Sequence, residues 1–544
     1  MISDSNFTVV FTNEEKAIKA IYTDKICNKI YLFSRKTTWN DFAYKPYGKF
    51  LLRLNEVVVD GLVYVATFTE KYIESGKYMG IGNLDLPDSE MSNFFTLLED
   101  MAAYRRLVNM VGPSVAKRIL NVLNDLVEIK SRPDKKLLYN QAIASEIFRL
   151  AFMRNSEAFF AYHNAHDILR GIEFESFDYI SKNLKLTFQL EGFSNPHEIF
   201  FSFGSSQIIP KRINVLIGEN GLGKSQSLNQ FIRAALQQNK CKHNLVALGA
   251  ESQRPMISRL LAIGTPGETK NTYPNDSIKK PKIYYKRLVL TRNARSKNNK
   301  TICSSLIQLI RNKDFIGDET RYQIFKYVIA NFFPLDSLVI PLKNYHTNYI
   351  SLKDLDKLPG EQTRLELWSN IDDAGELKIQ YKANGQLYPM SSGQLSFFKF
   401  ALLACLHIEN GSFVLLDEPE THLHPNFISG YIALLDNILE KTGSYGIIAT
   451  HSPYFVREVA REQVHVFKKT NDGAIYISHP KLKTFGANIG DISYFVFDEE
   501  ITNSLSQKIL DKAKRESLSF EDIVSLSNSE LPAEMLQEIK RKLS

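Results

Sequence analysis

The sequence predicts an α/β protein whose central mixed sheet carries a phosphate-binding site. Three segments lead to this prediction, and in each a short apolar strand ends in glycine-rich or polar residues. They are the glycine-rich loop at 218–225 after the strand 213–217, the acid pair Asp417-Glu418 after 413–416, and His451 after 447–450. Continuous apolar runs of this length are typical of strands buried on both faces of a sheet.

The loop matches the phosphate-binding spacing G-x-x-x-x-G-K-[ST] in full. It consists of Gly218, Glu219, Asn220, Gly221, Leu222, Gly223, Lys224 and Ser225. Glycines let backbone N–H groups curl round a phosphate, and the positive end of the following helix adds to the attraction. We expect Lys224 to reach the β- and γ-phosphates and Ser225 to ligate Mg²⁺. A chance glycine-rich turn is the alternative, and the flanking strand and amphipathic helix disfavour it.

A second group of polar residues follows later in the chain. Ser391, Ser392, Gly393 and Gln394 open a predicted helix, ahead of the acid pair and the histidine. Taken singly, two acids at a strand end could form an edge salt bridge, and a lone histidine is as often structural as functional. Their order after a complete phosphate loop favours a shared site.

These segments resemble those of the ABC ATPase superfamily. LLDEPE resembles its Walker B strand, MSSGQ its signature and ATHSP its switch-histidine segment. The resemblance implies ATP and Mg²⁺ as cofactors, with Asp417 holding the metal, Glu418 acting as general base and His451 contacting the γ-phosphate. It also implies that Ser391 and Gly393 cap the γ-phosphate bound by an opposite subunit, in a homodimer or higher oligomer. Ser392 replaces the glycine of transporters, as in the SMC-like and RecF-like soluble branch, which the OLD-like proteins join.

Within that branch, DEPETHLHP, ATHSPYFV and residues 484–492 resemble the PtuA ATPases of Septu-type antiphage systems, including those beside retrons. This implies an ATP-hydrolysing subunit of an antiviral complex that senses or gates for an HNH-type, PtuB-like nuclease. A RecF-like repair ATPase acting directly on DNA and a nucleotide-bound scaffold are the alternatives. His422 and His424 form an H-x-H that could bind metal, but they stand where the family has a dimer-contact loop.

A basic stretch from Lys279 to Lys300 is a candidate nucleic-acid contact. It contains nine Lys and Arg residues and no acid, namely Lys279, Lys280, Lys282, Lys286, Arg287, Arg292, Arg295, Lys297 and Lys300. Tyr284 and Tyr285 lie within it and could stack on bases. A solvated loop, or a strand that packs its tyrosines inward, is the alternative. The family's Q-loop glutamine (Gln253 is a candidate) and its adenine-stacking aromatic have no clear place in the sequence.

The pattern of the chain predicts four regions. Alternating runs predict a β-rich region at 1–85, and the helical spacing of Phe94, Leu98, Met101 and Val108 begins a helical region at 86–172. The ATPase core is expected at 173–495, with a helical subdomain within about 300–395, and a helical tail at 496–544. Four scattered cysteines, no secretory leader and no long apolar run predict a cytoplasmic protein without a membrane span.

Overall fold

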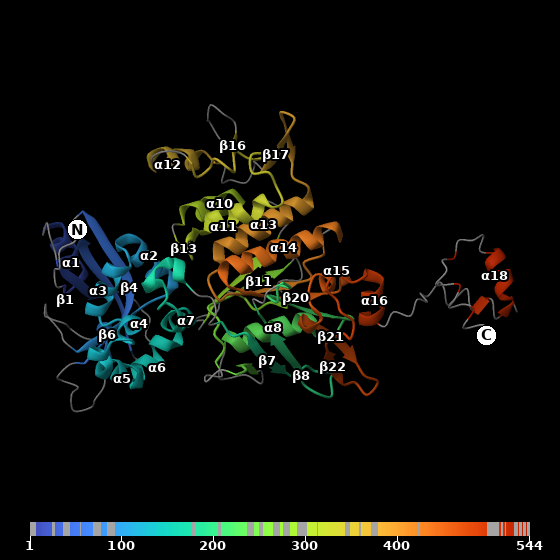
Figure 1. Ribbon diagram of the computed structural model, residues 1–544, viewed down its shortest axis with the longest axis horizontal. Helices are drawn as coiled ribbons and strands as arrows, with labels where there is room; N and C mark the ends of the chain where they lie inside the picture. The colour runs from blue at the N-terminus through green and yellow to red at the C-terminus, as the bar shows by residue number, and fades with distance from the viewer. Residues whose placement is uncertain are drawn as a thin grey trace.

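The computed structural model describes most of the chain, and Figure 1 shows its arrangement. The described residues are 7–23, 28–35, 44–54, 56–68, 78–83, 93–175, 180–204, 208–236, 244–249, 254–264, 272–275, 283–290, 302–312, 314–342, 349–357, 361–371, 379–421, 425–497, 511–512, 515–516, 518–526, 531, 536 and 540.

A seven-stranded sheet forms the centre of the molecule, in the order β12-β11-β19-β20-β9-β21-β22. Its strands are β9 (Ile213–Gly218), β11 (Arg259–Gly264), β12 (Tyr284–Val289), β19 (Phe413–Asp417), β20 (Tyr445–Thr450), β21 (Val464–Lys469) and β22 (Ile475–Ser478). All neighbours are parallel except β21 and β22. Strands β9, β19 and β20 are buried along their whole length, as their apolar runs predict. The fold is therefore α/β with a mixed sheet, as predicted.

Helices cover both faces of this sheet. The helix α8 (Lys224–Leu236) packs on one face, where Phe231 lies 5.6 Å from the ring of Phe413 on β19. The opposite face carries α13 (Ser392–His407) and α14 (Pro425–Thr442), which share a hydrophobic cluster with the other side of the same strands. Beyond α8 lies a three-stranded antiparallel sheet, made of β7 (Asn183–Phe188), β8 (His197–Ser202) and β10 (Asn244–Ala247).

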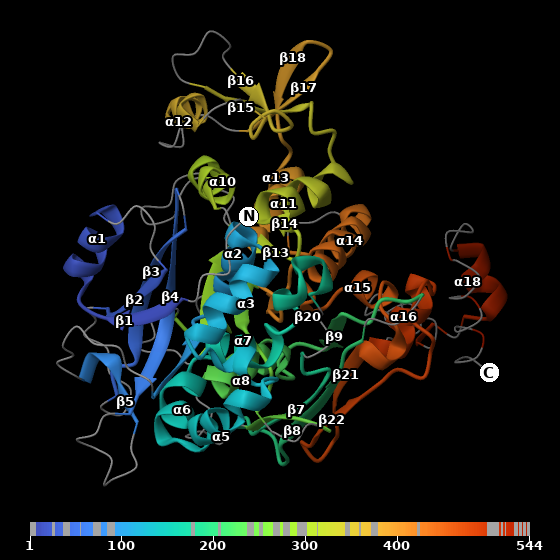
Figure 2. The same cartoon turned by 60° about the vertical axis from the view of Figure 1, so that its left-hand side comes forward.

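The subdomain expected at about 300–395 contains a sheet as well as helices. Its helices are α10 (Ile302–Arg311), α11 (Arg321–Ala330) and α12 (Glu361–Asn370). A short hairpin of β13 (Phe315–Ile316) and β14 (Glu319–Thr320) precedes α11, and β15 (Leu338–Pro341), β16 (Tyr349–Ser351), β17 (Gln380–Ala383) and β18 (Gln386–Pro389) form a four-stranded antiparallel sheet. This sheet lies beyond α10 and α11 from the central sheet, and the β17–β18 hairpin leads directly into α13 (Figures 1 and 2).

The N-terminal region combines a six-stranded sheet with a layer of helices. The sheet contains β1 (Thr8–Phe11), β2 (Lys29–Ser34), β3 (Tyr47–Leu54), β4 (Val57–Thr67), β5 (Met79–Gly80) and β6 (Phe94–Leu98), with α1 (Glu14–Thr23) against it. The helical layer contains α2 (Met101–Val111), α3 (Pro113–Val122), α4 (Leu126–Ile129), α5 (Lys136–Ala144), α6 (Glu146–Leu150) and α7 (Ser156–Asn164).

Residues 94–98 differ from the sequence prediction. Phe94 and Leu98 were expected at the start of a helix, but they belong to β6, which pairs with β4. Every residue of β6 is buried, so it lacks the alternation that marks a half-exposed strand, and the four-residue spacing of its apolar ends imitates a helix. Helix α2 begins only at Met101. Its N-cap is Asp100, whose side chain accepts a hydrogen bond from the Ala103 amide.

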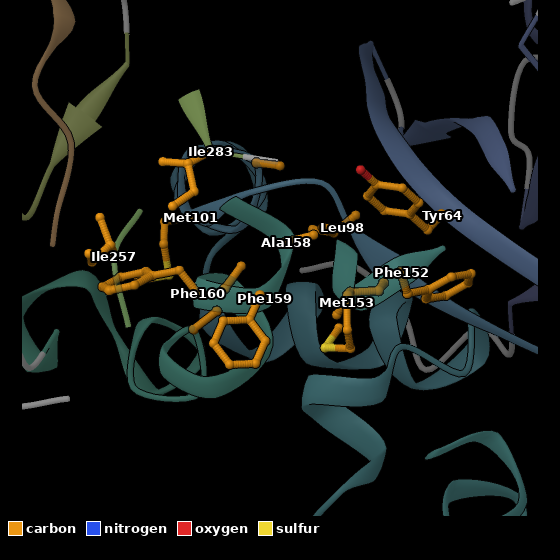
Figure 3. Close-up of a cluster of buried hydrophobic side chains, with 14 of the residues drawn as sticks. Tyr64, Leu98, Met101, Phe152, Met153, Ala158, Phe159, Phe160, Ile257 and Ile283 are labelled. Carbon is orange, nitrogen blue, oxygen red and sulfur yellow. The ribbon is translucent and has the colours of Figure 1, made fainter. Parts of the chain in front are cut away.

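The N-terminal region and the central sheet share one hydrophobic core. Figure 3 shows part of it, where Phe159 and Phe160 of α7 lie near Met101, Ile257 and Ile283. Phe160 also packs against Gly411, where an added Cβ would lie 2.4 Å from its ring. These contacts lie near the first residues of β11 and β19. The N-terminal region therefore adjoins the edge of the sheet at which these parallel strands begin.

The remaining described helices follow β20 and β22. They are α15 (Pro453–Arg457), α16 (Ile489–Phe497) and α18 (Phe520–Leu526). Within the described part of the chain, every helix is too short or too polar to cross a membrane.

Candidate nucleotide site

The phosphate loop joins the end of β9 to the start of α8. Gly218 has a φ of +148° and Gly223 a φ of +95°, a backbone region that side chains with a Cβ rarely adopt. A Cβ on Gly218 would lie 2.5 Å from the Phe467 carbonyl oxygen, and one on Gly223 would lie 2.9 Å from Nε2 of His197. The glycines therefore permit both the turn and the close packing beneath it.

Lys224 is buried at the base of this loop. Its Nζ donates to the carbonyl oxygens of Gly218 and Glu219, each at 2.8 Å. Burial lowers the pKa of Lys224 to about 8, although nearby carboxylates, Glu418 first, act in the opposite direction. A polyanion placed against this ammonium would relieve the cost of keeping it charged.

Asp417 brings two hydroxyl groups to the end of β19. Oδ1 accepts from Ser225 Oγ and Oδ2 accepts from Thr272 Oγ1, both at 2.8 Å. Hydroxyl and carboxylate oxygens are the ligands that Mg²⁺ prefers, so Ser225 and Asp417 fit the predicted metal role. Thr272 also belongs to this hydrogen-bonded group, although no sequence motif indicated it.

Glu418 and His451 face each other at the ends of β19 and β20. Glu418 Oε1 lies 3.2 Å from His451 Nε2, and His451 Nδ1 lies 3.5 Å from Lys224 Nζ. Glu418 has a φ of +43°, a costly backbone conformation for a residue with a Cβ and one that recurs at functional sites. Burial, then the charge of Lys224, lowers the pKa of His451, which favours a neutral ring that donates from Nε2 to Glu418.

A pocket of about 340 Å³ opens above these groups. It is lined by Leu190, Glu191, Phe193, Asn220, Gly221, Gly223, Lys224, Ser225, Gln226, Glu418 and His451. Phe193 comes from the turn between β7 and β8, a segment without a recognisable motif, and its ring contacts His197 edge-on at 4.8 Å. It is an aromatic ring in the pocket lining that the sequence analysis did not single out. Gly218, Glu219 and Leu222 belong to the loop but not to the pocket lining. The Leu222 carbonyl instead accepts a 3.2 Å hydrogen bond from His197 Nε2.

The signature residues lie outside this pocket. Ser391 caps the N-terminus of α13, and its hydroxyl accepts from the Gln394 amide while the Gln394 side chain accepts from the Ser391 amide. Ser391 and Ser392 are exposed, and Gly393 has room around its α-carbon, with Phe427 nearest at 3.9 Å from an added Cβ. One chain therefore does not bring its own signature to its own phosphate loop.

The basic stretch is only partly described. Tyr285 is buried and donates to the Pro274 carbonyl, while Tyr284 hydrogen-bonds His407 and has the Arg259 guanidinium 4.5 Å from its ring centre. Tyr285 is buried and Tyr284 partly buried, which favours the alternative in which the strand packs its tyrosines inward. Lys286 and Arg287 lie on β12, and the other seven basic residues of the stretch lie outside the described residues.

Two other sequence interpretations fall in undescribed segments. Gln253, the candidate Q-loop glutamine, and the pair His422 and His424 lie outside the described residues. Strand β11 pairs with β19 on the side away from β20, and residues 265–282 that follow β11 contain no glutamine, so the Q-loop glutamine stays unassigned. Within the described ranges, no group of three His, Cys, Asp or Glu residues is arranged to hold a metal ion without other ligands.

Comparison with known proteins supports the ATPase class. A family model described as "AAA domain, putative AbiEii toxin, Type IV TA system" matches residues 298–457, which include Asp417, Glu418 and His451. Protein ea59 of Escherichia phage lambda is 34% identical over 176 residues, 32% of this chain and 33% of that protein. The chain thus matches about a third of the length of this curated relative. The family match supports the prediction of an ATPase over residues 298–457, and the phosphate loop at 218–225 lies before the matched segment.

Solved structures of ATPase heads and transporters also align with the chain. An SMC head domain from Thermotoga maritima is 18% identical with a TM-score of 0.26, over 55% of this chain and 100% of that one. An SMC head bound to the C-winged helix domain of ScpA is 13% identical with a TM-score of 0.28, over 56% and 98% of the two chains.

Proposed function

We propose that the chain binds ATP with Mg²⁺ in the described pocket and hydrolyses it. The meeting of Lys224, Asp417 and Glu418 at one edge of the sheet is the observation that carries this proposal. Lys224 exchanges its loop carbonyls for phosphate oxygens, and Ser225 and Asp417 hold the metal, which neutralises phosphate charge when bound. Phe193 is placed to stack on the adenine ring.

Hydrolysis needs a base beside the γ-phosphate, and Glu418 is the base in this proposal. It accepts a proton from the attacking water, while His451 Nε2–H orients the carboxylate and contacts the γ-phosphate. The exposed signature at the start of α13 supports a dimer in which each Ser391 caps the nucleotide held by the other subunit. Steady-state phosphate release by the wild type, and its loss in Lys224→Ala protein shown to be folded, tests the activity.

We further propose that this activity serves antiviral defence with a partner nuclease. The family model's description supports the first part, and the resemblance to PtuA supports the second. Affinity purification from the native host, followed by mass spectrometry, should recover a small HNH-type protein in stoichiometric amount. Recovery of the ATPase without any nuclease would contradict the proposal.

The repair alternative predicts direct DNA contact through the basic stretch. Arg287 is unsuitable for the test because it donates to the Tyr273 carbonyl, next to Thr272. Replacing Arg292, Arg295 and Lys297 with alanine should instead weaken DNA binding and flatten its salt dependence. DNA-stimulated turnover of the isolated chain, lost in this variant, would favour the alternative over the nuclease complex.

A further inference from the structure

Glu420 lies two residues beyond the proposed base and does not line the pocket. Its Oε1 accepts hydrogen bonds from the Thr450 hydroxyl and from the His451 amide, the latter at 2.9 Å. The Thr450 hydroxyl in turn accepts from the Ser452 amide at 2.9 Å. A single carboxylate oxygen thus fixes the backbone of the switch-histidine segment. These hydrogen bonds make Glu420 a poor candidate for the general base.

The other oxygen of Glu420 has no use in this arrangement. Oε2 is buried and has no hydrogen-bond partner among the described residues. The hydroxyl of Tyr431 on α14 is likewise buried and has no hydrogen-bond partner in the described part of the chain. The ring of Tyr431 packs on that of Phe455, three residues beyond Ser452, and burial, and then the charge of Glu420, raises the pKa of Tyr431. A buried acceptor and a buried donor, each without a hydrogen-bond partner, require a reason, because each costs free energy.

Tyr431 lies between the signature helix and the helix that follows the switch histidine. Its ring centre is 4.5 Å from that of Phe400 and 5.6 Å from that of Phe397, both on α13. The ring of Phe455 on α15 is 6.5 Å away on another side. A shift of α13 when its N-terminal signature engages a nucleotide would therefore move the Tyr431 hydroxyl relative to Glu420.

We propose that Glu420 is a positioning residue for hydrolysis, and that the Tyr431 hydroxyl donates to its free Oε2 in the hydrolysing state. The inference rests on the proposed ATPase function. In this proposal the signature helix is connected to His451 within one chain. When the signature binds a nucleotide, the Tyr431 hydroxyl donates to Glu420. That hydrogen bond holds residues 450–452 so that His451 contacts both Glu418 and the γ-phosphate.

The first test is Tyr431→Phe, which removes one oxygen atom and keeps the packed ring. A hydroxyl without a function would be lost at no cost, so stability would stay equal or rise and turnover would stay unchanged. The proposal expects kcat to fall about tenfold, the value of a hydrogen bond to a charged group, while the Kd for ATP and the Tm without nucleotide stay as in the wild type. Wild-type kcat in this variant would overturn it.

Tyr322→Phe is the matched control. Tyr322 belongs to the same hydrophobic cluster, but its hydroxyl donates to the Leu352 carbonyl at 2.9 Å, away from the nucleotide pocket. This variant should lower the Tm and leave kcat alone, the reverse of Tyr431→Phe. Equal losses of kcat in both variants would show that turnover responds to general loosening of the cluster and would contradict the inference.

A double-mutant cycle completes the test. Glu420→Gln should lower kcat with ATP affinity preserved, and adding Tyr431→Phe to it should cause little further loss, because the bond is already impaired. Losses that multiply would show that the two side chains act separately. Wild type and Lys224→Ala run in the same assay: absent Lys224-dependent turnover would defeat the ATPase proposal and this inference together, whereas normal turnover in Tyr431→Phe would defeat only the inference.

Discussion

Lys224 must keep its charge in a place that disfavours charge. Its ammonium is buried at the base of the loop, and its pKa falls to about 8 for that reason. The negative charge of a bound phosphate stabilises the ammonium, so the pKa of Lys224 must be higher with nucleotide bound than without it. ATP affinity at this site is consequently linked to pH in a range where most lysines do not titrate.

The first prediction concerns that linkage. Below about pH 8 the free protein holds the charged lysine, and above it the lysine must take up a proton before it binds phosphate. ATP affinity should therefore fall as the pH rises from about 7.5 to 9.5, by up to tenfold per pH unit. Binding isotherms across this range measure the effect. Lys224→Arg stays charged throughout and is the control; a wild-type Kd independent of pH would show that the lysine is charged by other means.

Glu418→Gln should bind ATP and hydrolyse it very slowly. Loss of a general base typically costs about 10²–10⁴-fold in rate, and Lys224, proposed to bind the phosphates, is held by the Gly218 and Glu219 carbonyls rather than by this side chain. Single-turnover hydrolysis together with the ATP Kd measures the two effects. Wild-type hydrolysis would require another base, and Glu420 is a poor candidate since its carboxylate accepts from the Thr450 hydroxyl and the His451 amide.

The sequence predicts site residues that belong to contiguous motifs, and it does not predict those that packing brings to the site. Contiguous motifs at the ends of β9, β19 and β20 contain Lys224, Asp417 and His451. Because parallel strands end at one edge of the sheet, these motifs were enough to group the three residues. Phe193, Thr272 and His197 reach the same site from segments with no motif, because the antiparallel sheet and the loop after β11 place them there. Sequence spacing carries no signal for contacts made by packing of this kind.

At the scale of elements, a buried ion cluster ties α2 and α11 to the segment between α13 and β19. Arg105 pairs with Glu175 at 2.7 Å and with Glu409 at 2.9 Å, and Arg321 pairs with Glu409 at 2.8 Å. Burial would raise the pKa of Glu409, but Arg105, Arg321 and Arg259 outweigh it and lower the pKa to about 2. The stability that Glu409 contributes is therefore present above pH 4.5 and is lost as the pH falls towards 2.

Arg105→Met should destabilise the protein by about 3–5 kcal/mol, because it leaves buried carboxylates short of a partner. Its chain neighbour supplies the control: Arg106 pairs with Asp314 at 2.8 Å but is half exposed, and Arg106→Met should cost at most about 1 kcal/mol. Urea unfolding followed by circular dichroism measures both. Equal losses in the two variants would show that the buried cluster has no special weight.

At the scale of the whole molecule, the proposed site needs two chains. Lys224→Ala and Ser391→Arg homodimers should each be inactive, the first for want of a phosphate contact and the second because a large cation replaces the capping hydroxyl. A mixed dimer has one site with both segments intact, so each mixed dimer should recover up to about half of the wild-type turnover if the sites are independent.

Ser391 is also an N-cap, and its loss costs about 1 kcal/mol, so thermal unfolding must show that Ser391→Arg is folded. If subunits exchange and the mixed dimer stays inactive, while a dimer of wild type and Lys224→Ala turns over, the arrangement in trans is wrong. A fully active Ser391→Arg homodimer would remove the signature from the reaction.

The shared core has a consequence for any shorter form of this protein. A gene fragment that begins at residue 173 would keep every motif of the nucleotide site, yet its product would lose α7 and with it the ring that lies on Gly411 and the carboxylate that pairs with Arg259. The starts of β11 and β19 would then meet water along an apolar surface that the whole chain never shows. Such a fragment should aggregate or be degraded, so the border between the first two regions and the ATPase is not a place where the chain can be divided.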